Sequence, residues 1–136
     1  MKKLEKYLAL DYGASKIGLA LADSEVRIAF AYSTLDNDRH FMEVLGKIIE
    51  LEEIDKIIMG TLGMAGAKQK KSFEAEEIGE KIKKELEIDI VYQEEMFSTK
   101  MAQSNLKEKG MKKIKQWDNQ EAAKIILQSW LDKKHR

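Results

Sequence analysis

The sequence contains no cysteine and no proline, and it has only two histidines among its 136 residues, His40 and His135. The absence of cysteine excludes disulfide bridges, thiolate metal ligands and cysteine nucleophiles. Two imidazoles give poor support to a multi-histidine zinc site or to a Ser–His–Asp triad. Any chemistry carried out by this chain should therefore depend on carboxylates, hydroxyls, amines or backbone groups.

Long hydrophobic segments and an overall charge are also missing. No apolar run approaches the ~20 residues that a membrane span needs, and no apolar signal segment follows Met1. We therefore expect one cytoplasmic domain over residues 1–136, with no membrane partner. The 24 basic and 24 acidic side chains cancel, which gives no global argument for binding nucleic acid. A local basic face could still bind one.

Lysines are concentrated in two segments, residues 67–71 and 107–115. Such runs are often only solvated loops, and that interpretation needs no function. Alternatively, Lys68, Lys70 and Lys71 contact phosphates, provided that they flank an acidic site.

Hydrophobic periodicity predicts the order β-β-β-α-β-α-β-α-α. The strands are expected at residues 4–10, 17–22, 26–32, 56–60 and 88–92. The helices are expected from Phe41, through Ala75 to Leu86, around Met101 to Leu106, and from about Asn119 to Lys133. Three antiparallel strands followed by βαβ units predict a mixed five-stranded sheet flanked by helices, the ribonuclease H-like architecture. A fold alone assigns no function.

Acidic residues end two of the predicted strands. Asp11 follows the first strand and Gly13 follows closely, an arrangement that suits a metal or a phosphate but also an ordinary turn. Glu94 and Glu95 end the last strand, where they could simply be solvated, and at most one of them should face a given site. The carboxyl ends of the first, fourth and fifth strands should share one edge, where ligands collect. Carboxylates there could hold Mg²⁺ or Mn²⁺.

The start of the last predicted helix allows two interpretations. Asp118 and Glu121 form a capping-box-like pair, which is purely structural. Asn119, however, shares a helical face with Ala122 and Ala123, whose small side chains would let the helix lie close to the sheet. A group at position 119 could therefore project toward the acidic site.

Three segments together resemble the YqgF family, whose members are known as RuvX-like Holliday junction resolvases and as pre-16S rRNA nucleases. The segments read L-A-L-D-Y-G-A-S-K-I-G-L-A-L-A-D, E-E-M-F-S-T-K-M-A and A-A-K-I-I-L-Q-S-W-L-D. The resemblance spans residues 7–132, and the family is similar in fold to ribonuclease H and RuvC. It places the family's first aspartate on Asp11, its basic turn residue on Lys16 and its strand-end glutamate on Glu95. Its hydroxyl pair falls on Ser98 and Thr99.

The sequence departs from this family at two positions. The family's third acid falls on Asn119, whose neutral amide should hold a metal more weakly than a carboxylate. Asp118 lies one residue earlier, ~100° away around a helix, and could replace that acid only if it lies outside the helix. After Gly60, where the family usually has proline, this chain has Leu62 in a loop that looks shorter.

The resemblance implies phosphodiester hydrolysis with two Mg²⁺ (or Mn²⁺) ions about 3.5–4 Å apart, acting on structured RNA or branched DNA. It is compatible with a monomer or a weak homodimer. One alternative is a nucleic-acid-binding module without catalysis, which Asn119 favours. A less favoured alternative is an ATP-binding domain of the actin and sugar-kinase type, which also begins with D-x-G but needs two such domains.

Overall fold

The computed structural model describes residues 4–61, 70–94 and 114–134. These form eight elements, which follow one another along the chain in the predicted order. They are β1 (Lys6–Asp11), β2 (Lys16–Asp23), β3 (Phe30–Asp36), α1 (Phe41–Glu52), β4 (Lys56–Thr61), α2 (Lys70–Leu86), β5 (Asp89–Glu94) and α4 (Ile114–Lys134). The predicted helix around Met101 lies outside the described residues.

The strands form one five-stranded sheet in the order β3-β2-β1-β4-β5. β2 is antiparallel to both β1 and β3, whereas β4 is parallel to both β1 and β5. The predicted mixed sheet is therefore confirmed. Because β1, β4 and β5 run in the same direction, their carboxyl ends meet at one edge of the sheet.

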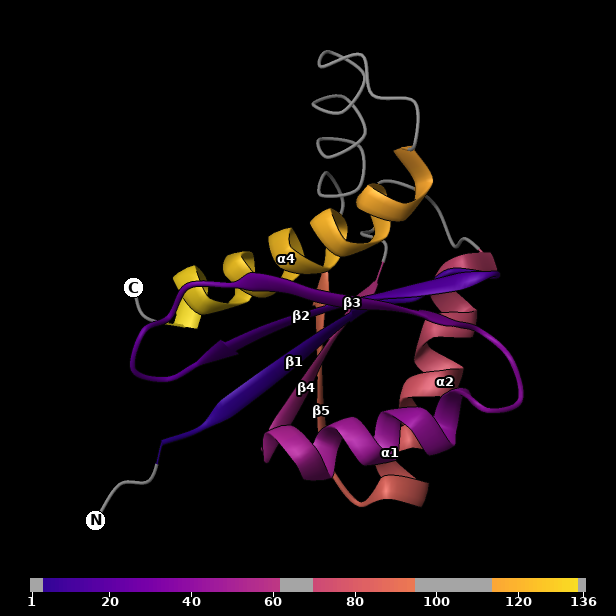
Figure 1. Ribbon diagram of the computed structural model, residues 1–136, viewed down its shortest axis with the longest axis horizontal. Helices are drawn as coiled ribbons and strands as arrows, with labels where there is room; N and C mark the ends of the chain where they lie inside the picture. The colour runs from indigo at the N-terminus through magenta and orange to yellow at the C-terminus, as the bar shows by residue number, and fades with distance from the viewer. Residues whose placement is uncertain (1–3, 62–69, 95–113, 135–136) are drawn as a thin grey trace.

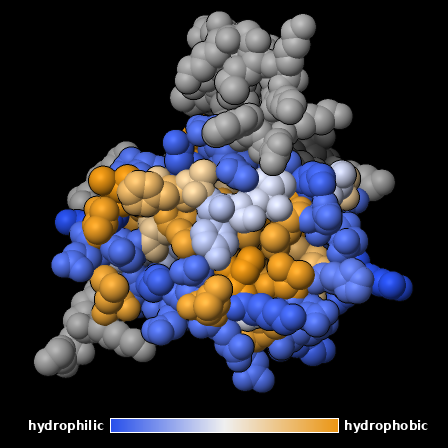
Figure 2. Space-filling model, in the orientation of Figure 1, coloured by the Kyte–Doolittle hydropathy of each residue, from blue (hydrophilic) through white to orange (hydrophobic). Residues whose placement is uncertain are grey.

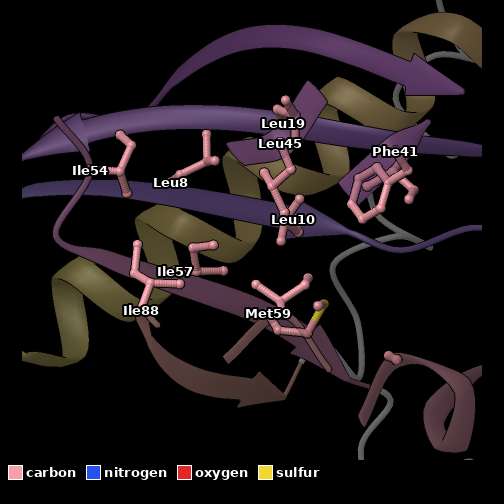
Figure 3. Packing of buried hydrophobic residues seen from close by; sticks show 12 residues of the cluster. Leu8, Leu10, Leu19, Phe41, Leu45, Ile54, Ile57, Met59 and Ile88 are labelled. Atoms are coloured by element: carbon pink, nitrogen blue, oxygen red, sulfur yellow. The ribbon is translucent and has the colours of Figure 1, made fainter. Parts of the chain in front are cut away.

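Helices cover both faces of the sheet: α1 and α2 lie on one side and α4 on the other (Figure 1). The face toward α1 and α2 is lined by large aliphatic side chains (Figure 3). This first cluster includes Leu8, Leu10, Leu19, Phe41, Leu45, Ile57 and Met59, all at most 4% exposed. Burial of these side chains contributes strongly to the free energy of folding, because buried apolar area is the main favourable term in folding.

The face toward α4 is built from smaller side chains. Its cluster contains four buried alanines of the sheet and its edge, together with residues of α4: Ala9, Ala20, Ala22, Ala29, Ala123, Ile126, Leu127 and Trp130. Tyr7 packs edge-on against Trp130, with ring centroids 4.8 Å apart. Small residues on the sheet allow the α4 backbone to approach closely, as it does at Gly18.

The third strand differs from the predicted one, which covered residues 26–32. The Asp23 carboxylate accepts hydrogen bonds from the backbone N–H groups of Glu25 and Val26, and this turn delays the strand until Phe30. Val26, Ile28 and Phe30 alternate as a strand would, but they are 52–59% exposed. Figure 2 shows apolar surface at the left of this face, where Figure 1 places the connection between β2 and β3.

The last helix also begins earlier than predicted, at Ile114 instead of Asn119. Asp118 therefore lies in the second turn of α4, so the interpretation of Asp118 as a helix cap is wrong. At its C-terminus, α1 ends on Glu53, which has a φ of 55° in the left-handed region. No helix among the described residues is both long and apolar enough to cross a membrane.

Candidate functional site

Three polar side chains are buried in the described part of the chain, and each lies at the carboxyl end of a different parallel strand. Asp11 ends β1 and is 3% exposed, Thr61 ends β4 and is 7% exposed, and Gln93 lies one residue before the end of β5 and is 7% exposed. Polar groups are costly to bury away from water and are rarely fully buried without a reason. Their gathering at one edge marks this edge as the candidate site.

Asp11 lies on the face of the sheet that α4 covers. Side chains alternate along β1, and Tyr7 and Ala9 already belong to the cluster against α4, so Asp11 shares their face. In the ladder between β1 and β2, Asp11 is paired with Gly18. The acid predicted to be a metal ligand therefore lies beneath the N-terminal half of α4.

Gly18 brings α4 to this point. A Cβ atom built on Gly18 would lie 2.0 Å from the backbone oxygen of Asn119 and 3.0 Å from its Cα atom. Only a residue without a side chain leaves room for the helix backbone here. Gly18 is the direct cross-strand partner of Asp11, so the Asn119 backbone packs on the strand next to Asp11.

Gln93 lies on the same face of the sheet as Asp11, on the side away from Gly18. Ile58 and Val91 face α4, so the pleat also places Gly60 and Gln93 on that face, where they pair with each other. Gly60 has no side chain to fill the space between Asp11 and Gln93. The sequence analysis missed Gln93, although an amide at the end of an otherwise apolar strand was a usable signal.

Lys16 opens β2 at the same edge and on the same face. It is paired with Asp36 in the β2–β3 ladder, and the two side chains form an ion pair. Thr34, two residues before Asp36, accepts a hydrogen bond from Gln120 of α4, which fixes the face on which these side chains lie. Both members of the ion pair are more than half exposed, so Lys16 remains accessible to an anion.

Tyr92 fixes α2 against the neighbouring part of β5. Its hydroxyl donates a hydrogen bond of 2.8 Å to the Glu80 carboxylate, and burial, followed by this carboxylate, raises the pKa of Tyr92 far above its usual value. Gly79 makes room for the ring, since a Cβ there would lie 2.5 Å from the tyrosine oxygen. These contacts hold the helix whose first residue is Lys70.

Several predicted site residues cannot be placed on this edge. Glu95, Ser98, Thr99, Lys68 and Leu62 lie outside the described residues. Lys70 and Lys71 form the start of α2, and Asp118 lies within α4. Within residues 4–61, 70–94 and 114–134, no three acidic, histidine or cysteine side chains are close enough to hold a metal ion.

The donors that do meet at this edge still fit a hard cation. Asp11 offers a carboxylate, and Asn119 and Gln93 offer amide oxygens, the ligand types that Mg²⁺ and Mn²⁺ accept. The set has one formal charge, so further acids would be needed to balance two divalent ions.

Comparison with solved structures first identifies the fold. The fold is similar to Thermus thermophilus RuvC in complex with a Holliday junction substrate, with a TM-score of 0.62, 11% identity and 96% of each chain covered. At this identity the likeness shows the ribonuclease H-like fold alone, and it confirms the predicted architecture.

Sequence comparison then identifies the family. Residues 5–133 match the family described as "RuvX: Holliday junction resolvase", and the chain belongs to this nuclease family. It is 32% identical to a protein of Maridesulfovibrio salexigens, covering 93% of this chain and 97% of the relative. It is 37% identical to a protein of Ureaplasma parvum, covering 94% and 97%. Both relatives carry the name "Putative pre-16S rRNA nuclease".

Proposed function

We propose that this chain is a metal-dependent nuclease that hydrolyses phosphodiester bonds in structured nucleic acid. The observation that carries the proposal is that the buried Asp11 pairs with Gly18, the residue on which the Asn119 backbone packs, at the edge where the parallel strands end. Membership of the RuvX family supports the reaction class. The names of the relatives favour structured RNA such as the end of a precursor of 16S rRNA, and the family description favours a branched DNA junction.

The proposed site would be held by three residues, of which Asp11 ends β1 and Asn119 lies in α4. Asp11 and Glu95 supply carboxylates and Asn119 supplies an amide oxygen to Mg²⁺ or Mn²⁺. When bound, such metals activate water and stabilise the leaving oxygen of a phosphodiester. Gln93 supports the position proposed for Glu95, because it lies two residues earlier in the sequence and on the same face as Asp11. Asp118 is disfavoured, because α4 begins before it and a helical neighbour points ~100° away from Asn119.

Binding of the substrate backbone is assigned to cations and hydroxyls around this site. Lys16 is the best supported phosphate contact, since it lies on the face of Asp11 and is exposed. Lys68, Lys70 and Lys71 are proposed to contact phosphates further along the nucleic acid, with Ser98 and Thr99. The start of α2 at Lys70 supports this assignment, because the N-terminus of a helix attracts anions.

Asp11→Asn tests the proposal. Cleavage of a four-way DNA junction and of an RNA carrying a 16S precursor end would be measured with Mg²⁺ and with Mn²⁺, alongside thermal unfolding. We expect cleavage to be abolished, while the free energy of unfolding stays the same or rises because a buried charge is removed. Asp89→Asn, at the opposite end of β5, is the matched control and should cleave normally. A variant that is destabilised by ~1–3 kcal/mol but fully active would instead make Asp11 a structural turn residue.

The second candidate is a binding module without catalysis, and the amide at position 119 favours it. In that case the wild-type protein would bind the junction or the RNA, but no metal would produce cleavage. The ATP-binding alternative predicts stoichiometric binding of Mg-ATP, which the nuclease proposal does not. Sedimentation with and without a junction distinguishes a monomer from the weak homodimer that symmetric cutting of a junction would require.

A further inference from the structure

The turn between Asp11 and Lys16 is held in place by the last residue of β3, Asp36, and by the residue that follows it, Asn37. The side-chain amide of Asn37 donates a 2.7 Å hydrogen bond to the Gly13 carbonyl, and the Asn37 backbone N–H donates a 2.9 Å hydrogen bond to the Ser15 carbonyl. The carboxylate of the preceding residue, Asp36, forms the ion pair with Lys16. Two consecutive residues therefore hold both the backbone of this turn and the cation that follows it.

The turn itself is tightly closed and depends on this support. A Cβ atom on Gly13 would lie only 2.5 Å from the Lys16 carbonyl oxygen, so the two ends of the turn almost touch. Among the described residues, the Asn37 amide is the side chain that donates a hydrogen bond to the Gly13 carbonyl. Loss of its amide would leave this part of the turn without the hydrogen bond that links it to β3.

The Asp36 carboxylate, in contrast, opposes the binding of a phosphate to Lys16. The ion pair joins two side chains that are 53% and 65% exposed, and exposed pairs contribute little to stability. When a phosphate approaches, Lys16 would thus exchange one weakly bound anion, the Asp36 carboxylate, for another. Until that exchange, Asp36 competes with the phosphate for the ammonium group of Lys16.

We propose that Asp36 and Asn37 are positioning residues that set, in opposite directions, how strongly Lys16 binds a phosphate of the nucleic acid. Asn37 strengthens binding by fixing the turn that presents Lys16. Asp36 weakens binding by competing for the ammonium group, which favours release of the nucleic acid. The inference rests on the proposed function, because it takes Lys16 to be a phosphate contact.

The test measures binding of a fluorescent four-way DNA junction, without divalent metal, over a series of salt concentrations. Lys16→Ala should weaken binding and reduce the slope of log K against log[salt] by about 0.9, one phosphate contact. Asp36→Asn should tighten binding by about two- to fivefold, the range that an exposed ion pair can account for. Asn37→Ala should weaken binding by about two- to tenfold, the range for one hydrogen bond.

Two controls separate this mechanism from general effects of charge and folding. Asp89→Asn removes the same charge at the other end of the sheet, and it should tighten binding less than Asp36→Asn does. In a Lys16→Ala background, both the Asp36 and the Asn37 substitutions should lose their effect on binding, which a general loss of stability would not produce. Thermal unfolding of each variant confirms that it is folded.

The outcomes distinguish the inference from the function on which it rests. If Lys16→Ala leaves affinity and salt slope unchanged, Lys16 is not a phosphate contact and that part of the proposed function fails. If Lys16→Ala weakens binding but Asp36→Asn also weakens it, or matches Asp89→Asn, competition by Asp36 is wrong. If Asn37→Ala is as harmful without Lys16 as with it, Asn37 does not act through Lys16.

Discussion

The two faces of the sheet are built from the same strands but from different kinds of side chain. Toward α1 and α2, β1 presents Leu8 and Leu10, which are fully buried against Leu45 and their neighbours. Toward α4, the same strand presents Tyr7 near its start and then Ala9 and Asp11. The face toward α1 and α2 is therefore filled by large side chains, whereas small residues on the other face let the backbone of α4 come close to the sheet.

The two faces therefore contribute differently: the face toward α1 and α2 mainly to stability, and the face toward α4 mainly to the geometry of the site. Large aliphatic side chains bury most apolar area, so the α1 and α2 face should carry most of the folding free energy. On the α4 face, the absence of a side chain at Gly18 decides where Asn119 lies. Substitutions on the first face should therefore change stability more than site geometry, and those at Gly18 should change both.

The largest effect on stability is expected for Leu8→Ala on the first face. Leu8 is fully buried, and truncating such a leucine costs about 2–5 kcal/mol of unfolding free energy because a cavity remains. Chemical denaturation measures this loss. Junction binding by the fraction that remains folded should be unchanged, and a loss of affinity larger than the loss of folded protein would contradict the separation of the two faces.

A smaller effect, but one that reaches the site, is expected for Gly18→Ala. Its Cβ would lie 2.0 Å from the Asn119 carbonyl oxygen, so α4 must move, at a cost of about 1–3 kcal/mol. Binding of Mn²⁺, followed as a metal-dependent rise in melting temperature, should weaken as well. Gly46→Ala is the control: its Cβ would meet only Leu86, at an ordinary 3.5 Å, and alanine should stabilise α1 by up to ~1 kcal/mol. Equal effects of the two substitutions would overturn this explanation.

Tyr7→Phe tests the far end of the α4 face. The Tyr7 hydroxyl donates a 2.9 Å hydrogen bond to Glu5, and its loss should cost about 0.5–1.5 kcal/mol at neutral pH. Burial, and then Glu5, raises the pKa of Tyr7 to about 12, above the ordinary value of 10. The contribution of Tyr7 is therefore complete below pH 10 and is lost as the pH rises from 10 to 12. Unfolding free energies of the two proteins should converge over that window; a constant difference would contradict the raised pKa.

The smallest effect on stability is expected for Asn119→Asp, which brings a second carboxylate close to Asp11. Without metal, the repulsion should cost about 1 kcal/mol or less. With Mn²⁺ or Mg²⁺ the sign should reverse, because a carboxylate binds the cation more tightly, and cleavage should need less metal. Asp118→Asn should change neither quantity. If Asp118→Asn abolishes cleavage while Asn119→Asp has no effect, the acid at 118 is the functional one.

Most of the fold could be predicted from the sequence, because the elements with clear periodicity lie in the core. β1 and β4 were placed within two residues of their observed ends, and α1 begins at Phe41 as predicted. The third strand was misplaced because Val26 and Ile28 alternate without being buried, so periodicity alone could not locate the ladder. The start of α4 was misplaced because Asp118 and Glu121 imitate a cap inside a helix that is already formed.

The site was predictable only in part, for a related physical reason. Asp11 could be selected because the end of a strand is visible in a sequence, whereas Lys16 was selected only through the resemblance to the family. Gln93 carried a usable signal, an amide at the end of an apolar strand, but Asn37 carried none, since its importance comes from a contact with a distant turn. The meeting of Asn119 with Gly18 depends on two residues about a hundred positions apart, which no local pattern records.

The position of α4 in the chain has a consequence for synthesis. This helix follows β5 in sequence, yet it packs against β1, β2 and β3, which leave the ribosome much earlier. Until α4 emerges, the alanine-lined face of the sheet remains open to water and Asp11 has no helix above it. At about 5–20 residues per second, the segment after β5 takes several seconds to make. A nascent copy that stops before α4 lacks Asn119, so the site that we propose can be completed only in the last seconds of translation.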